Sequence, residues 1–265
     1  MIKIIYKTLI TLILLLLILI VYLSTIGIKT DRLNSKIISQ IKKIESNIEV
    51  NLNDVGATLD PFNFGVNVKT IGTDIIYRDK VIKLESIKSN ISLKSFINQK
   101  FAIKRISVST KSLSIKAVIT FIRLLNNDPK LFIAEQFIKN GYLVADISLE
   151  FDDQGNINDN YKIKGLVRNG HISLLKKYNF NKIDFIFGYE DKNLKFKDIN
   201  LFLNNKNISM PELTSTIKNN GYKISGKINN DNIELDQSEI DNFTQNDLLG
   251  LKIKDITFSS QSDFK

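Results

Sequence analysis

Few residues of this chain have the types and spacing that enzyme chemistry requires. His171 is the only histidine and cysteine is absent, which excludes histidine-carboxylate triads, multi-histidine metal centres, thiolate nucleophiles and disulfides. The chain also lacks the G-x-x-x-x-G-K-[ST], G-x-S-x-G and H-E-x-x-H patterns. His171 follows an Asn-Gly pair, which is typical of an exposed turn. The sequence therefore predicts a protein that is not an enzyme and has no cofactor.

One polar stretch carries oxygen ligands of the kind that calcium prefers. It does not follow the D-x-[DN]-x-[DN]-G register, and it lacks the distal glutamate of a calcium-binding loop. We interpret it as a solvated turn between two strands and predict no metal site. The stretch consists of Asp152, Asp153, Asn156, Asn158 and Asp159.

The elements that would position functional side chains begin with an apolar N-terminal segment. Lys3 and Lys7 lead into residues 8–28, which carry no charge. A helix of that length covers about 31 Å, the thickness of the hydrocarbon layer of a membrane. A cleaved signal peptide is the alternative, but its apolar region is usually only about 7 to 15 residues long and ends at small residues. We expect residues 1–28 to form an uncleaved transmembrane anchor.

Residues 29–47 predict a juxtamembrane amphipathic helix, because apolar residues recur there every three or four positions. The apolar stripe is narrow, so we expect this helix to cap the following domain; binding to lipid headgroups is the alternative. Basic residues flank the anchor on both sides, and long domains translocate largely regardless of charge, so the charge count leaves the topology open. The stripe consists of Leu33, Ile37, Ile41, Ile44 and Ile48.

The charge of the chain does not indicate nucleic acid binding. The net charge is +9, from 37 basic and 28 acidic residues. The lysines are scattered among Ile, Asn and Asp, without an arginine run or a cluster of basic and aromatic residues. We therefore expect no nucleic acid partner.

Beyond the anchor, the chain is long enough for one large β domain or two small ones, and we assign residues 48–265 to one mainly β domain. Apolar residues alternate with polar ones over long stretches, as in residues 143–151. Short polar turns, such as residues 190–193 and 204–207, join the strands and predict a long, twisted antiparallel meander. Phase slips within long strands indicate bulges. One or two short helices are expected near residues 117–139.

Such a sheet has one apolar face and little helix to cover it. Either the sheet folds on itself into a closed sandwich, or its apolar face stays open as a groove. We favour the open groove. We also expect the strand at residues 251–258 to leave an unpaired edge that pairs with further β structure or with another copy of the chain. The residues expected to line the groove are Phe64, Val66, Val68, Ile147, Leu149, Ile163, Phe185, Phe187, Leu201 and Leu203.

Several segments carry a resemblance to a known family. They are residues 53–61 (NDVGATLDP), 64–71 (FGVNVKTI), 83–94 (KLESIKSNISLK), 103–108 (IKRISV), 146–151 (DISLEF), 161–172 (YKIKGLVRNGHI), 196–202 (FKDINLF) and 222–227 (YKISGK). Together with the N-terminal anchor, they resemble the AsmA-like family of the Gram-negative envelope. The chain is shorter than many members of that family, which leaves open a fragment, a minimal member or one part of an assembly.

The resemblance implies a single-pass protein of the bacterial inner membrane, mostly periplasmic, with a β-groove like those of bridge-like lipid carriers. From it we expect a non-enzymatic protein that binds phospholipid and serves phospholipid transport or outer-membrane homeostasis. The alternative is a structural or assembly protein whose β domain is a closed sandwich used for protein contact.

Overall fold

The computed structural model shows a mainly β chain whose strands form one antiparallel sheet that does not close on itself. Most neighbouring strands are also neighbours in the sequence, which confirms the predicted meander; β2, β5 and β8 lie off the main path. The chain divides into two compact units: unit 1 is Met1–Lys111 with Asp146–Lys162, and unit 2 is Ser112–Ala145 with Ile163–Lys265. The structure describes residues 2–31, 34, 38, 47–53, 55–100, 102–126, 128–159, 161–174, 178–218, 221–236 and 255–264.

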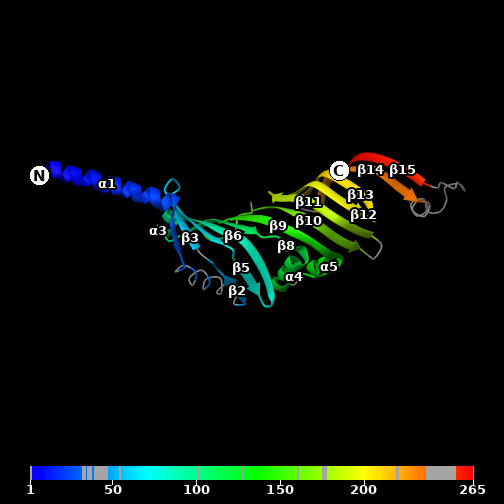
Figure 1. The fold of residues 1–265 in the computed structure, drawn as a ribbon, viewed down its shortest axis with the longest axis horizontal. Coiled ribbons are helices and arrows are strands. Elements are labelled where there is room, and N and C mark those ends of the chain that lie inside the picture. Colours follow the sequence, from blue (N-terminus) through cyan, green and yellow to red (C-terminus); the bar gives the residue numbers. More distant parts are fainter. Residues whose placement is uncertain are drawn as a thin grey trace. The chain divides into compact units, whose positions relative to one another are not determined.

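Unit 1 begins with helix α1, Ile2–Thr25, drawn in blue in Figure 1. Its segment Lys3–Thr25 has 23 residues and a mean hydropathy of 2.8, so it is long and apolar enough to cross a membrane. The hydroxyl groups of Thr11, Ser24 and Thr25 each donate to the carbonyl four residues earlier. These bonds satisfy polar groups for which a lipid environment offers no partner.

The end of α1 is attached to the sheet of unit 1. Gly27 has a φ of +70°, and a side chain there would lie 2.3 Å from the carbonyl oxygen of Ala57, so only glycine fits. Strand β1, Ile28–Thr30, then pairs with β3. The helix predicted over residues 29–47 is therefore wrong at its first two positions, since hydrogen bonding to β3 fixes them as a strand. Most of its other positions lie outside the described residues.

The remaining strands of unit 1 surround a small core. Val55 and Thr73 are fully buried, and Val50, Tyr77 and Leu84 are nearly so. Strand β6 is long because its first part pairs with β5 and its second part with β4 and β7. A register shift between Leu84 and Ser86 is one of the bulges that the sequence predicts. The elements are β2 Ile48–Asn51, β3 Val55–Asp60, β4 Gly65–Ile71, β5 Asp74–Tyr77, β6 Lys80–Ser92, α3 Leu93–Ile97, β7 Ile103–Thr110 and the second half of β9, Ile138–Glu150.

Unit 2 contains two of the four described helices, and they lie side by side in Figure 1. Helix α4, Ile115–Leu125, follows the short strand β8, Leu113–Ser114, and α5 is Pro129–Phe137, which confirms the helices expected near residues 117–139. Asp128 caps α5 by accepting from the backbone N–H of Lys130. Glu135 joins the helices by accepting from Thr120 at 2.6 Å and Arg123 at 2.7 Å.

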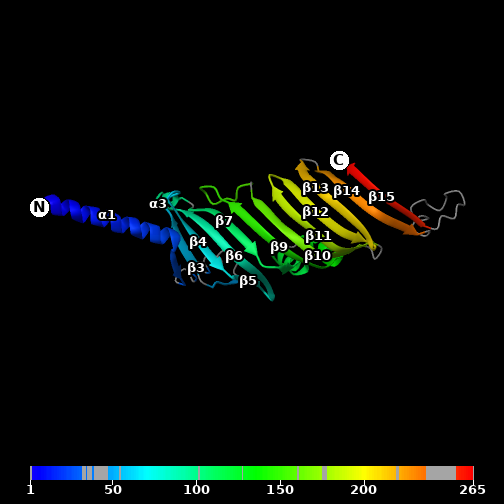
Figure 2. The ribbon, with the colours of Figure 1, turned by 45° about the horizontal axis from the view of Figure 1, so that its top comes forward.

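The strands of unit 2 run side by side in chain order from β9 to β15 (Figure 2). The turn between β11 and β12 has two residues with positive φ, Asp191 and Lys192, and the next turn has Asn204 and Asn205. Such two-residue turns match the twist of a β-hairpin. The strands are β10 Lys162–Leu174, β11 Tyr178–Glu190, β12 Asn193–Leu203, β13 Lys206–Lys218, β14 Gly221–Asp236 and β15 Asp255–Phe264.

The last strand differs from its predicted bounds. The sequence predicts a strand over residues 251–258, whereas β15 runs from Asp255 to Phe264. Residues 251–254 lie outside the described residues. Strand β15 pairs with β14 and stands at the end of the strand order, so among the described strands it has one hydrogen-bonded neighbour.

Candidate functional site

The sheet of unit 2 has one apolar face, and five of the predicted groove residues lie on it. Residues directly opposite each other on paired strands share a face. Phe187 lies opposite Gly165 on one side and Phe196 on the other. Phe185, Leu201 and Leu203 belong to one apolar cluster on this face, and the ring of Phe187 packs against that of Phe185. Ile163 precedes Gly165 by two positions in β10, which places it on the same face.

This apolar cluster is built from one layer. Ile183, Ile199 and Leu201 are buried, each with less than a tenth of its surface exposed. Every described member of the cluster comes from β10, β11, β12 or β13, and none comes from a helix or a second sheet. A closed sandwich would bring side chains from two facing sheets into one core. The partly buried members are Ile172, Phe180, Phe185, Phe196, Leu203, Ile208, Met210 and Leu213.

Two glycines make room for large side chains on this face. A Cβ on Gly165 would lie 2.8 Å from the ring of Phe187, and one on Gly170 would lie 2.9 Å from Ile183. Phe187 therefore occupies the space above Gly165. The ring of Phe185 contacts those of Phe187 and Phe196 edge-on, with centroids 6.1 and 5.5 Å apart.

Three members of the cluster, Ile183, Phe196 and Ile199, are not among the predicted groove residues. Ile183 alternates with Phe185 and Ile199 with Leu201, so the sequence pattern contains both. For Phe196 the alternation breaks at a bulge. Asp198 has a φ of 51°, and it shifts the phase of β12 between Phe196 and Ile199. Positive-φ Asn and Asp residues within a long apolar alternation are the signal that could have located the shift.

Four more of the predicted residues share the apolar face of unit 1. Val66 lies opposite Ile91, Val68 lies opposite Ser89, and that row continues through Ile106 to Leu149. Ile147 lies two positions before Leu149 on β9 and is on the same face. All four predicted side chains, Val66, Val68, Ile147 and Leu149, are half-buried.

Phe64 departs from the prediction. It lies in the turn before β4, with a φ of 45°. Its side chain is 53% exposed. The turn breaks the alternation that links Phe64 to Val66 in the sequence, so Phe64 is not part of the strand face.

A cavity of about 1270 Å³ lies on the opposite, polar face of unit 1, and of the ten predicted residues only Val68 lines it. One cross-strand row on this face reads Thr58, Asn67, Asn90, Arg105 and Glu150. Asn90 donates to Asn67 at 2.8 Å, and Arg105 pairs with Glu150 at 2.5 Å. The charged lining residues are Lys29, Lys69, Lys88, Lys104, Arg105, Asp60 and Glu150.

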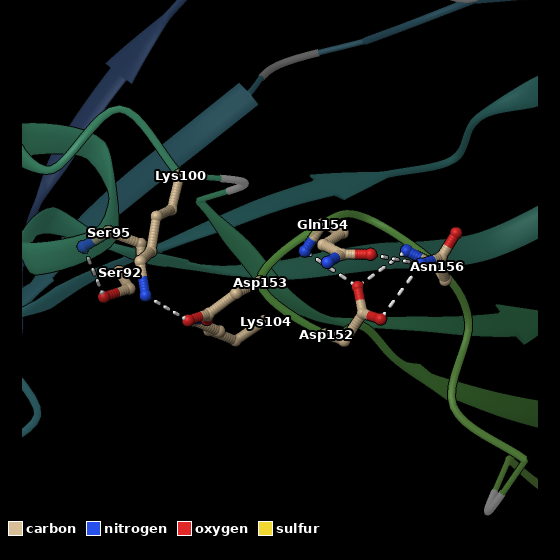
Figure 3. Close-up of polar contacts among 8 residues, drawn as sticks. All are labelled: Ser92, Ser95, Lys100, Lys104, Asp152, Asp153, Gln154 and Asn156. Carbon is tan, nitrogen blue, oxygen red and sulfur yellow. Dashed lines mark hydrogen bonds and ion pairs between the residues drawn. The ribbon is translucent and has the colours of Figure 1, made fainter.

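The acidic turn after β9 is held by its own hydrogen bonds (Figure 3). Asp152 accepts from the backbone N–H groups of Gln154 and Asn156 at 2.8 and 2.9 Å. Asp153 pairs with Lys100 at 2.7 Å and Lys104 at 2.6 Å. Hydrogen bonds from these two ammonium groups lower the pKa of the Asp153 carboxyl from 3.8 to about 2. The carboxylates of Asp152 and Asp153 thus stabilise a turn, as the sequence indicates.

No three His, Cys, Asp or Glu side chains come together as metal ligands in the part of the chain that the structure describes. The prediction that His171 lies in an exposed turn is wrong. His171 lies within strand β10 and is half-buried. The register shift between Gly170 and Ile172 explains the turn-like sequence, since a bulge uses the same residue types as a turn.

Comparison with models of known protein families, with curated proteins and with solved structures finds no match.

Proposed function

We propose that this chain is a membrane-anchored, non-enzymatic protein that holds the acyl chains of phospholipid on the apolar face of unit 2. The observation that carries the proposal is the one-layer cluster around Ile183, Ile199 and Leu201, to which β10 to β13 contribute every described member. Eight further apolar side chains around this centre are only partly buried. A bound acyl chain would complete their burial.

The energetics favour an extended apolar ligand. Burying a methylene group stabilises a complex by about 0.8 kcal/mol, so affinity grows with the length of chain that lies along the face. The cluster spans four neighbouring strands, and strands lie about 4.8 Å apart. The edge-on phenylalanine rings add flat surfaces against which an acyl chain packs.

The N-terminal helix supports a place at a membrane. Helix α1 has the length and composition of a membrane-spanning segment. The resemblance of the strand segments to AsmA-like proteins supports a location in the bacterial inner membrane with the bulk of the chain in the periplasm. In that setting we infer a contribution to phospholipid transport or outer-membrane homeostasis.

The test places a photoreactive benzoylphenylalanine in the full chain in its own membrane, at Phe187 or at Ile186. These positions are adjacent in β11, but Phe187 lies on the apolar face, whereas Ile186 is 45% exposed and pairs with Lys197 on the other face. Illumination is expected to attach phospholipid at position 187 and not at 186. Attachment of protein at position 187, without lipid, would favour the structural or assembly role instead.

A further inference from the structure

The polar face of unit 1 carries a row of lysines that the proposed lipid binding does not involve. One cross-strand row reads Lys29, Gly56, Lys69 and Lys88 across β1, β3, β4 and β6. All four residues line the cavity of about 1270 Å³. Three of the four residues in the row are therefore cationic.

Lys69 and Lys88 lie directly opposite each other on paired strands. Like charges in this position destabilise a sheet, because their side chains stand about 5 Å apart on one face. Such a pair is stabilised when an anion lies between or above the two ammonium groups.

Gly56 leaves a recess between Lys29 and Lys69. A Cβ at Gly56 would have only one neighbour within 4 Å, the Lys69 carbonyl oxygen at 3.8 Å. Lys29 and Lys69 flank this glycine on the adjoining strands, so their Cα atoms are about 10 Å apart. Lysine side chains are long enough to converge above the glycine from both sides.

The acidic residues that line the cavity contact residues outside the lysine row. Glu150 pairs with Arg105, and Asp60 accepts two hydrogen bonds from Asn63. Lys104 pairs with Asp153. Among the described residues, no acidic partner is left within ion-pair distance of Lys29, Lys69 or Lys88.

We propose that this row, with Gly56 at its centre, binds a phosphate group. A phosphate carries up to two negative charges and several strong acceptor oxygens, which suit three lysines converging on one recess. Asn67 and Asn90, in the neighbouring row, add amide groups beside the recess. Lys29 follows the end of α1 by four residues, so the phosphate comes either from a phospholipid headgroup or from a soluble phosphorylated compound.

The first test uses the full chain in nanodiscs of phosphatidylcholine, titrated with inorganic pyrophosphate, and in nanodiscs that also contain phosphatidic acid. The test variant is Lys69→Gln with Lys88→Gln. The control, Lys195→Gln with Lys197→Gln, removes the same charge from exposed positions of β12 in unit 2. We expect the test variant to weaken pyrophosphate binding about tenfold or more, or to abolish the rise in Tm that phosphatidic acid produces, while the control keeps both.

Binding of pyrophosphate identifies a soluble source, and stabilisation by phosphatidic acid alone identifies a headgroup. The proposal is overturned if neither probe acts on the wild type, or if the control variant loses as much as the test variant. Lipid capture at Phe187 is measured separately on the other unit, so the two proposals fail independently.

A second variant supplies the anion from within. Gly56→Asp places a carboxylate in the recess, and we expect it to raise Tm in phosphate-free buffer and to abolish binding of pyrophosphate. Gly56→Asn is the matched control, because it places a side chain of the same size in the recess without the negative charge. If Gly56→Asp melts no higher than Gly56→Asn and leaves pyrophosphate binding intact, the recess is not an anion site.

Discussion

Phe185 packs edge-on against two other phenylalanine rings and is still only half-buried. In an open face, a carboxylate at this position reaches water, so we expect the Phe185→Asp chain to stay folded and to shed bound lipid. In a closed core the same change buries an unpaired charge and costs several kcal/mol. Thermal melting of the full chain in detergent, with mass spectrometry of retained lipid, measures both effects.

The matched control for this substitution is Ile186→Asp. Ile186 is the next residue of β11, 45% exposed on the opposite face. The Ile186→Asp variant should retain both the fold and the bound lipid. An unfolded Phe185→Asp variant, or one that keeps as much lipid as Ile186→Asp, would contradict the open face.

Gly165 sets how closely β10 approaches its neighbours. A Cβ there would lie 2.3 Å from the backbone oxygen of Val144, which cannot move without its strand. We expect Gly165→Ala to cost about 1 to 3 kcal/mol in unfolding free energy, because overpacking distorts the sheet. Gly188→Ala, which meets only ordinary contact, should change stability by less than about 1 kcal/mol. Equal effects in denaturant titrations would contradict this packing.

At the scale of elements, the turn after β9 depends on the ionisation of Asp153. Its pKa is lowered from 3.8 to about 2 in the folded chain, so its stabilising contribution is present above about pH 4 and is lost as the pH falls towards 2. We expect Asp153→Asn to melt at a lower temperature than the wild type at neutral pH, and this difference to shrink as the pH falls towards 2. A difference that persists unchanged at pH 2 would show that charge is not its cause.

The strands, the helices of unit 2 and the apolar N-terminal helix could be predicted from the sequence, because each produces a periodic pattern within a short window. The positions of Phe64 and His171 could not be predicted, because a turn interrupts the pattern at Phe64 and a bulge interrupts it at His171. The cavity of unit 1 could not be predicted from the sequence either. Lys69 and Lys88 meet only through the register of β4 and β6, which no local pattern encodes.

At the scale of the whole molecule, the sheet has an end at β15. Among the described strands, β15 is hydrogen-bonded to β14 alone, so one row of its backbone groups is available to another strand. We expect this edge to pair with further β structure or with a second copy of the chain. A photoreactive residue at Ser259 should then capture protein in the membrane. Absence of capture, with slow amide exchange along both sides of β15 in the monomer, would contradict an available edge.

The order of the strands in unit 2 also bears on how such a chain folds and changes length. From β9 to β14 each strand is hydrogen-bonded to the strands before and after it in the sequence. Cooperativity therefore spreads from neighbour to neighbour, as in a one-dimensional array, and each hairpin can dock as it emerges from the ribosome. An inserted or deleted hairpin disturbs only the strands on either side of it. Evolution can accordingly lengthen or shorten this sheet two strands at a time without redesigning the rest.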